Sequence, residues 1–136
     1  MQLEINNRCF GCGADNPIGV KMRIEQQGDE AVSKMTVPED FRGRANMAHG
    51  GFLCTVMDEV MSWALRGTIH GGAVTAQLNV RFLKPVMVGS EIVARGRALG
   101  RRRNLLRAEA RVELKDGTVA ARAEGLFAIV GERYGG

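Results

Sequence analysis

One stretch of the chain, HGGFLCTVMDEVMSWALR at residues 49–66, predicts a helix that is apolar around most of its circumference. At about 100° per residue, its apolar side chains cover roughly 220° of the helix and its polar ones about 100°. The polar strip consists of Thr55, Asp58, Glu59, Ser62 and Arg66. A helix this widely apolar must be enclosed on most sides. We therefore expect a sheet that curls around it and leaves the strip with the two acids uncovered.

The segments on both sides of this helix are predicted to be β-strands. Apolar and polar residues alternate from residue 18 to 25, and residues 31–37 form a second strand after a turn at Gly28-Asp29. Further strands are expected at 74–83, 92–99, 106–114 and 119–130, and Asp116-Gly117 is a hairpin turn between the last two. The predicted fold class is α+β, in the order β-β-α-β-β-β-β, with a mostly antiparallel curved sheet around one long central helix.

The segment VTAQLNVRFL at 74–83 has the cleanest alternation in the chain. A regular strand has a side-chain period of two, so alternate residues share a face. One face is expected to carry Val74, Ala76, Leu78, Val80 and Phe82. The other is expected to carry Thr75, Gln77, Asn79 and Arg81.

Length and composition place the chain among ordinary single-domain proteins. Its 136 residues, 45% hydrophobic and 25% charged, allow one core spanning residues 1–136. No apolar run approaches the ~20 residues that span a bilayer, and MQLEINNRCF lacks the features of a secretory signal. We expect a cytoplasmic protein without a membrane partner. The net charge of +4 favours anionic partners, but aromatic residues, at 5%, are too few for the stacking platforms that bind RNA, so no nucleic acid is expected.

The helix begins with His49-Gly50-Gly51, although glycine is a poor helix former. Glycine allows a ligand to approach the unpaired N–H groups at the positive end of the helix dipole, a setting that suits an oxyanion or a polarised carbonyl. Asp58 lies about 12 Å further along the axis, at 1.5 Å per residue, so one helix cannot bring both groups to the same carbonyl carbon. Two antiparallel helices can, with Gly50 of one facing Asp58 of the other. If both groups are catalytic, the site spans a two-fold dimer interface.

Four motifs, in order along the chain, resemble the hot-dog-fold acyl-CoA thioesterases, in particular the phenylacetate-degradation (PaaI-like) group. The first is CFGCGADNPIGVKM, which is similar to a Cys-x-x-Cys-Gly…Asn-Pro-x-Gly-Leu opening. The second is the His-Gly-Gly at 49–51 with an acid nine residues after the histidine. The others are TAQLNVRFLKPVMVG, which is similar to Thr-x-x-Leu-x-Val-x-Phe-x-x-Pro-x-x-x-Gly, and the last hairpin, DGTVAARAEGLF. The resemblance runs from about residue 9 to 130 and implies the hot-dog fold.

The resemblance also implies roles for residues of this chain. Asp58 would attack the thioester carbonyl or activate water to do so, and the Gly50 N–H would bind the oxyanion. His49 would shape the helix start, while Thr75 would help to hold the water. Glu59 falls one place off the family position, so it is read as a supporting or surface acid, with reversal of the two acids left open.

Other residues are candidates for binding the substrate. Gly51 belongs to the same helix start, and Asn46 stands where many relatives have glycine; asparagine is among the few residues that tolerate a positive φ. Arg101, Arg102 and Arg103 are expected at a hairpin tip, where they contact the phosphates of coenzyme A or simply keep an edge soluble. Lys84 is a weaker phosphate candidate.

The three cysteines predict neither a disulfide scaffold nor a metal site. Cys9 and Cys12 form a single pair, while structural zinc takes four ligands. The other candidates, Cys54, His49 and His70, have no recognisable spacing. We expect no metal and no cofactor beyond coenzyme A as part of the substrate.

The sequence therefore predicts an acyl-CoA thioesterase that works as a homodimer, with a dimer of dimers (a homotetramer) also open. Two other functions remain possible at this stage: a hot-dog hydratase or dehydratase, with His49 as its histidine, and a non-catalytic acyl-CoA or small-ligand binder. The two acids also have a purely structural explanation, ion pairing with Arg66 or Arg81.

Overall fold

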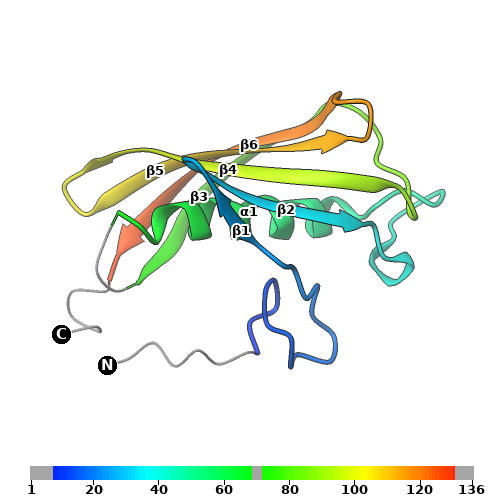
Figure 1. The fold of residues 1–136 in the computed structure, drawn as a ribbon, viewed down its shortest axis with the longest axis horizontal. Coiled ribbons are helices and arrows are strands. Elements are labelled where there is room, and N and C mark those ends of the chain that lie inside the picture. The colour runs from blue at the N-terminus through cyan, green and yellow to red at the C-terminus, as the bar shows by residue number, and fades with distance from the viewer. Residues whose placement is uncertain (1–7, 69–71, 131–136) are drawn as a thin grey trace.

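The computed structural model describes residues 8–68 and 72–130. Within these residues, a six-stranded antiparallel sheet curves over one long helix (Figure 1). The elements are β1 (Glu25–Gln27), β2 (Glu30–Thr36), the 3-10 turn η1 (Glu39–Phe41), α1 (Gly50–Leu65), β3 (Ala73–Phe82), β4 (Glu91–Arg102), β5 (Leu105–Leu114) and β6 (Val119–Ile129). The strands lie side by side in the order β1-β2-β4-β5-β6-β3. This is the hot-dog fold, in the predicted order of elements.

Helix α1 is enclosed as its sequence predicts. The buried side chains of the helix are all apolar: Phe52, Leu53, Val56, Met57, Val60, Met61, Ala64 and Leu65. The acids Asp58 and Glu59 are half-buried: the edge strand β3 reaches Asp58, and the loop at Cys9 contacts Glu59. The helix also begins and ends where predicted, with His49 as its N-cap and Arg66 as its C-cap.

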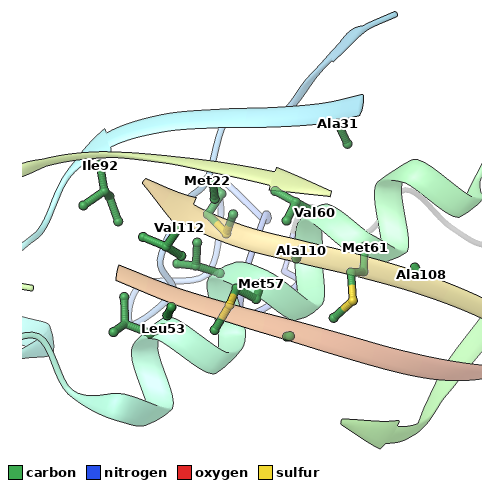
Figure 2. Packing of buried hydrophobic residues seen from close by; sticks show 14 of the residues in the cluster. Met22, Ala31, Leu53, Met57, Val60, Met61, Ile92, Ala108, Ala110 and Val112 are labelled. Atoms are coloured by element: carbon green, nitrogen blue, oxygen red, sulfur yellow. The ribbon is translucent and has the colours of Figure 1, made fainter. Parts of the chain in front are cut away.

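Two glycines let the sheet approach the helix closely. A Cβ on Gly96 of β4 would lie 2.4 Å from the Val60 carbonyl carbon, and one on Gly125 of β6 would lie 3.2 Å from the Met61 sulfur. Figure 2 shows the Met57 and Met61 side chains reaching from the helix towards the strands. Because methionine is unbranched and flexible, it fills the irregular space under a strongly curved sheet.

The first predicted strand is wrong over most of its length. Residues 18–24 form no strand, and β1 is confined to Glu25–Gln27. The alternation still reports burial correctly, because Val20 and Met22 are buried while Lys21 and Arg23 are exposed. Lys21 has a φ of 57°, which interrupts an extended chain. The segment bonds instead to the preceding loop, since the amide of residue 20 donates to the carbonyl of Phe10 at 2.8 Å.

Strand β3 lies at the edge of the sheet and contains a β-bulge that the sequence did not predict. Thr75 pairs with Phe127 and Gln77 with Leu126, so Ala76 is the extra residue. Because of the bulge, the residues before Ala76 face the opposite way from a regular strand. Thr75 and Leu78 therefore both face the core side of the sheet, whereas a regular strand would place them on opposite faces. The predicted shared face of residues 74, 76, 78, 80 and 82 is therefore wrong at its start.

None of the helices in the described part of the chain has the length and apolar character needed to cross a membrane.

Candidate functional site

The start of α1 presents a free backbone donor at its first residue. The Nδ1 atom of His49 accepts a hydrogen bond from the Gly51 amide at 2.8 Å. A Cβ on Gly51 would lie 3.0 Å from that nitrogen, so glycine allows the imidazole to fold over the first turn. The Gly50 amide makes no hydrogen bond within the described residues. An unpaired N–H at the positive end of a helix is a ready site for negative charge.

The turn that leads into the helix has the conformation predicted for Asn46. Asn46 has a φ of 61°, in the left-handed region that asparagine tolerates, and Ala45 before it has a φ of 48°. The Asn46 carbonyl accepts a hydrogen bond from the Val88 amide at 2.8 Å. Asn46 therefore has a clear role in shaping the turn.

A cleft of about 550 Å³ lies beside the helix start. Its lining includes His49 and Gly50 from the helix start and Phe82 and Lys84 from the end of β3 and the loop after it. A Cβ on Gly50 would lie 3.5 Å from the Phe82 ring, so the aromatic side chain is a wall against the bare backbone. Lys84 is exposed and places a positive charge at this end of the molecule.

Asp58 and Thr75, separated by 17 residues in the sequence, meet on the core side of the sheet. The Thr75 hydroxyl donates a hydrogen bond of 2.7 Å to Oδ1 of Asp58. The bulge at Ala76 makes this contact possible, because it turns Thr75 towards the helix. One carboxylate oxygen is thus held by a fixed donor, while the carboxylate as a whole is only half-buried.

The ion pairs considered for the two acids do not form within the described residues. Arg66 instead stacks on the Trp63 indole, with its guanidinium carbon 3.9 Å from the ring centroid. Asp58 also acts on Cys54, one helical turn earlier. Burial raises the pKa of the Cys54 thiol, and the negative charge of Asp58 raises it further. Asp58 therefore has a hydroxyl partner and no cationic one in the described chain.

Glu59 points to a different neighbourhood from Asp58. The Cys9 thiol donates a hydrogen bond of 3.3 Å to Oε1 of Glu59, and the Cys12 amide lies 3.5 Å from the Cys9 sulfur. Burial, a hydrogen bond with Cys9 and the Glu59 charge raise the pKa of the Cys12 thiol to about 12. Sequence reasoning missed this cluster, because Glu59 is 50 residues from Cys9 and only the fold joins them. His70, the other ligand candidate considered from the sequence, lies outside the described residues.

The three arginines lie at the hairpin tip between β4 and β5, as predicted. Arg101 and Arg102 end β4, and Arg103 begins the turn with a φ of 56°. Strand pairing places Arg101 in one row with Leu106, Phe127 and Thr75, from β4 across to β3. Three strand spacings of about 4.8 Å put Arg101 about 14 Å from Thr75. Within one chain the arginines thus lie at the Asp58 end of α1, whereas Lys84 lies at the Gly50 end.

The described chain therefore carries two separate groups of candidate functional residues. An amide donor and Lys84 lie at one end of α1, and the Asp58–Thr75 pair with the arginines lies at the other. Gly50 and Asp58 are eight residues apart on the same straight helix, about 12 Å along its axis. The structure does not bring them together within one chain.

Known proteins similar to this chain share its fold. Among solved structures, a protein of the thioesterase superfamily superposes with a TM-score of 0.76 at 21% identity, over 82% of this chain and 57% of that one. The PaaI protein of E. coli, from the phenylacetic acid degradation operon, gives 0.73 at 20% identity, over 81% of this chain and 80% of that one. A Streptococcus mutans UA159 protein, solved bound to acetyl-CoA, gives 0.73 at 19% identity, over 81% and 89% of the respective chains.

A curated relative and a family model extend the comparison to sequence. The chain is 29% identical over 82 residues to acyl-coenzyme A thioesterase 13 of Mus musculus, a match that covers 60% of this chain. The match spans 59% of the relative's length. The model of the Thioesterase superfamily matches residues 45–121, which include the helix start, Asp58, Thr75 and the arginine hairpin. With more than half of its length matched by this model, the chain belongs to the Thioesterase superfamily.

Proposed function

We propose that this protein is an acyl-CoA thioesterase, which hydrolyses the thioester to a free acid and coenzyme A. The observation that carries the proposal is the 2.7 Å hydrogen bond between Thr75 and Asp58, on the same helix whose first amide is unpaired. A carboxylate positioned by a hydroxyl, together with a backbone oxyanion donor, is sufficient for this reaction. Membership in the Thioesterase superfamily supports the same chemistry.

In the proposed reaction, Asp58 acts as a general base. Thr75 occupies Oδ1 of the carboxylate, so Oδ2 is the oxygen that takes a proton from water. The hydroxide attacks the thioester carbonyl, and the Gly50 N–H binds the negative oxygen that forms. The carbon–sulfur bond then breaks, and coenzyme A leaves as a thiolate, which is a weaker base than an alkoxide and needs no obligatory acid. The proton held by Asp58 passes to the thiolate or to solvent, which restores the carboxylate. Hydrolysis in ¹⁸O-labelled water tests the alternative, because label in Asp58 would identify it as a nucleophile.

The proposed active unit is a two-fold homodimer. Strand β3 is an edge strand of ten residues, and two of its large apolar side chains are uncovered: Val74 is 53% exposed and Phe82 54%. An exposed apolar edge of this length is a template for pairing with another chain. Antiparallel pairing of β3 with a second copy would set the two α1 helices side by side in opposite directions. Each of two sites would then contain Gly50 and Lys84 of one chain and Asp58, Thr75 and the arginines of the other.

The remaining candidates have supporting roles in this scheme. Gly51 gives its amide to His49 and so shapes the helix start. With Nδ1 of His49 accepting that bond, the neutral ring carries its proton on Nε2 and can donate to a substrate. A dehydratase mechanism needs a histidine that accepts a proton, so this contact favours thioester hydrolysis.

Release of free thiol from a panel of acyl-CoAs tests the reaction. We expect turnover by the wild-type protein and a large loss of kcat in Asp58→Asn, while Asp29→Asn, the same charge change at an exposed turn, keeps full activity. Far-ultraviolet circular dichroism checks that both variants fold. Saturable binding of acyl-CoA without turnover by the wild type would show a ligand-binding protein instead.

Mixed dimers test the shared site. Asp58→Asn and Gly50→Pro, which lacks the amide proton, each disable both sites of a homodimer. A dimer with one chain of each kind, isolated through two different tags, contains one intact site and one doubly defective site. We expect it to recover about half of the wild-type rate. No recovery in a correctly assembled mixed dimer would place the whole site within one chain, and light scattering distinguishes dimer from tetramer.

A further inference from the structure

The loop before the sheet brings two thiols onto the side of α1 that the sheet leaves uncovered. Figure 1 shows this loop, drawn in blue, below the helix, with the sheet above. The Cys9 and Cys12 sulfurs and a carboxylate oxygen of Glu59 all lie within 4.8 Å of one another. All three residues are half-buried. None of them belongs to the Asp58–Thr75 pair or to the helix start.

The separations within this cluster fit a tetrahedral metal ion. With a zinc–sulfur bond of about 2.3 Å and a zinc–oxygen bond of about 2.1 Å, two ligand atoms of a tetrahedron are about 3.6 Å apart. The Cys9 sulfur and Oε1 of Glu59 are 3.3 Å apart. We propose that Cys9, Cys12 and Glu59 bind one Zn²⁺ ion, with a water molecule in the fourth position.

The ligand types agree with zinc. Thiolates select Zn²⁺ over the hard ions Mg²⁺ and Ca²⁺, which take oxygen ligands, and one carboxylate completes a set of three anions. Without a cation the thiols keep their protons, as in the hydrogen bond that the Cys9 thiol donates to Glu59. Metal binding releases these protons and forms three coordinate bonds.

The surroundings of the cluster hold its ligands in place. A Cβ on Gly11 would lie 2.3 Å from Cγ of Glu59, so only glycine allows the loop to press on this side chain. The Met22 amide donates to the Gly11 carbonyl at 2.9 Å, which fixes the loop between the two cysteines. The Cys12 amide is directed at the Cys9 sulfur at 3.5 Å, which helps to hold that side chain in place.

Trp63 supplies a second donor, one helical turn after Glu59. Its indole Nε1 is buried and has no well-formed hydrogen bond in the described chain. The indole lies close enough to interact with the Cys12 sulfur. Donors to the ligand atoms orient them and tune a metal site. If the Cys12 sulfur binds the metal as a thiolate, it can accept a hydrogen bond from the buried N–H of the Trp63 indole.

The proposed ion would fasten the N-terminal loop to α1 immediately after Asp58. Its role is structural, so it goes beyond the proposed hydrolysis and does not depend on it. Cys54, on the same helix, is outside the cluster and serves as the matched control.

Metal binding by the reduced, untagged full-length protein tests the proposal. After chelation and desalting, Zn²⁺ is added and the bound metal is measured by mass spectrometry; Co²⁺ added instead reports thiolate ligation by its sulfur-to-metal absorption in the near-ultraviolet. We expect one ion per chain in the wild type and in Cys54→Ser, and loss of the Co²⁺ band in the Cys9→Ser/Cys12→Ser variant. Glu59→Gln should keep the band and bind zinc more weakly.

A protease digest of the wild type gives a readout that does not depend on any variant folding. Bound Zn²⁺ should slow cleavage of the loop at 8–19, and a chelator should restore it. The proposal is overturned if the reduced wild type binds no more Zn²⁺ than the double-serine variant. It is also overturned if Cys54→Ser loses the Co²⁺ band.

Discussion

Replacing Gly50 with proline removes the proposed oxyanion donor with little change to the helix. Gly50 is the first residue of α1, where proline is favoured because its fixed φ suits the helix and the amide there has no intrahelical partner. His49 has a φ of −64° and a ψ of 137°, the extended conformation that a residue before proline adopts. A Cβ at residue 50 meets the Phe82 ring at 3.5 Å, an ordinary contact. The substitution therefore deletes one N–H and keeps the fold.

The size of the effect follows from the number of donors lost. Removal of one oxyanion-hole donor costs about 10²–10³ in kcat, or about 2.7–4 kcal/mol. Gly50→Ala is the matched control, because it adds the same Cβ but retains the N–H. Both substitutions reduce the freedom of the unfolded chain, so neither should lower the free energy of unfolding. We expect a large loss of kcat in the proline variant alone.

Steady-state release of thiol from an acyl-CoA, together with thermal unfolding, measures both quantities. The comparison that matters is proline against alanine, since both add the same Cβ to the cleft and proline differs from alanine only in the ring atoms that replace the N–H. A proline variant with an unchanged Tm and a kcat within about threefold of the alanine variant would refute the role of the Gly50 amide.

Three further predictions concern other parts of the molecule. Thr75→Val should lower kcat/KM by about 10- to 150-fold, as expected for a lost hydrogen bond of about 1.5–3 kcal/mol to the charged Asp58. Thr75→Ser keeps the hydroxyl and should keep the activity, so an equal loss in both variants would contradict the hydroxyl's role. Gly96→Ala should reduce the free energy of unfolding, measured in urea, by about 1–3 kcal/mol, because its methyl group overlaps the helix backbone, whereas Gly100→Ala, with open space around it, should not. Replacing Arg101, Arg102 and Arg103 with serine should raise the KM for acyl-CoA more than it lowers kcat. An unchanged KM would exclude these arginines from phosphate binding.

The main architecture could be predicted from the sequence because it depends on local pattern. The width of the apolar surface on residues 49–66 required a sheet around the helix, and the Asp116-Gly117 turn was readable from two residues; Gly117 has a φ of 87°. The strand expected over residues 18–24 does not form, because alternation alone does not show what buries a side chain. Alternation records which side chains are buried, but Val20 and Met22 are buried by a loop pairing rather than by a sheet.

The parts of the candidate site that escaped prediction depend on contacts between distant residues. Thr75 was identified through a family resemblance, yet strict alternation placed it on the wrong face, since nothing in the sequence marks Ala76 as an extra residue. The Cys9–Cys12 pair was evaluated against histidines and a third cysteine. Its actual partner, Glu59, is brought to it by the fold of the N-terminal loop over the helix.

The bulge in β3 makes the direction of Thr75 depend on how the strand pairs rather than on which residue is at position 76. Ala76 is exposed, so many side chains would fit there without disturbing a neighbour. If Ala76 were instead paired in a regular ladder, every residue before it would rotate by half a turn. Thr75 would then point to the outer surface and Asp58 would lose its hydroxyl, although neither residue had been changed. Deleting Ala76 would have no such effect, because Thr75 would then stand two residues before Leu78 and share its face. The chemistry at this edge therefore depends on one residue staying out of the ladder.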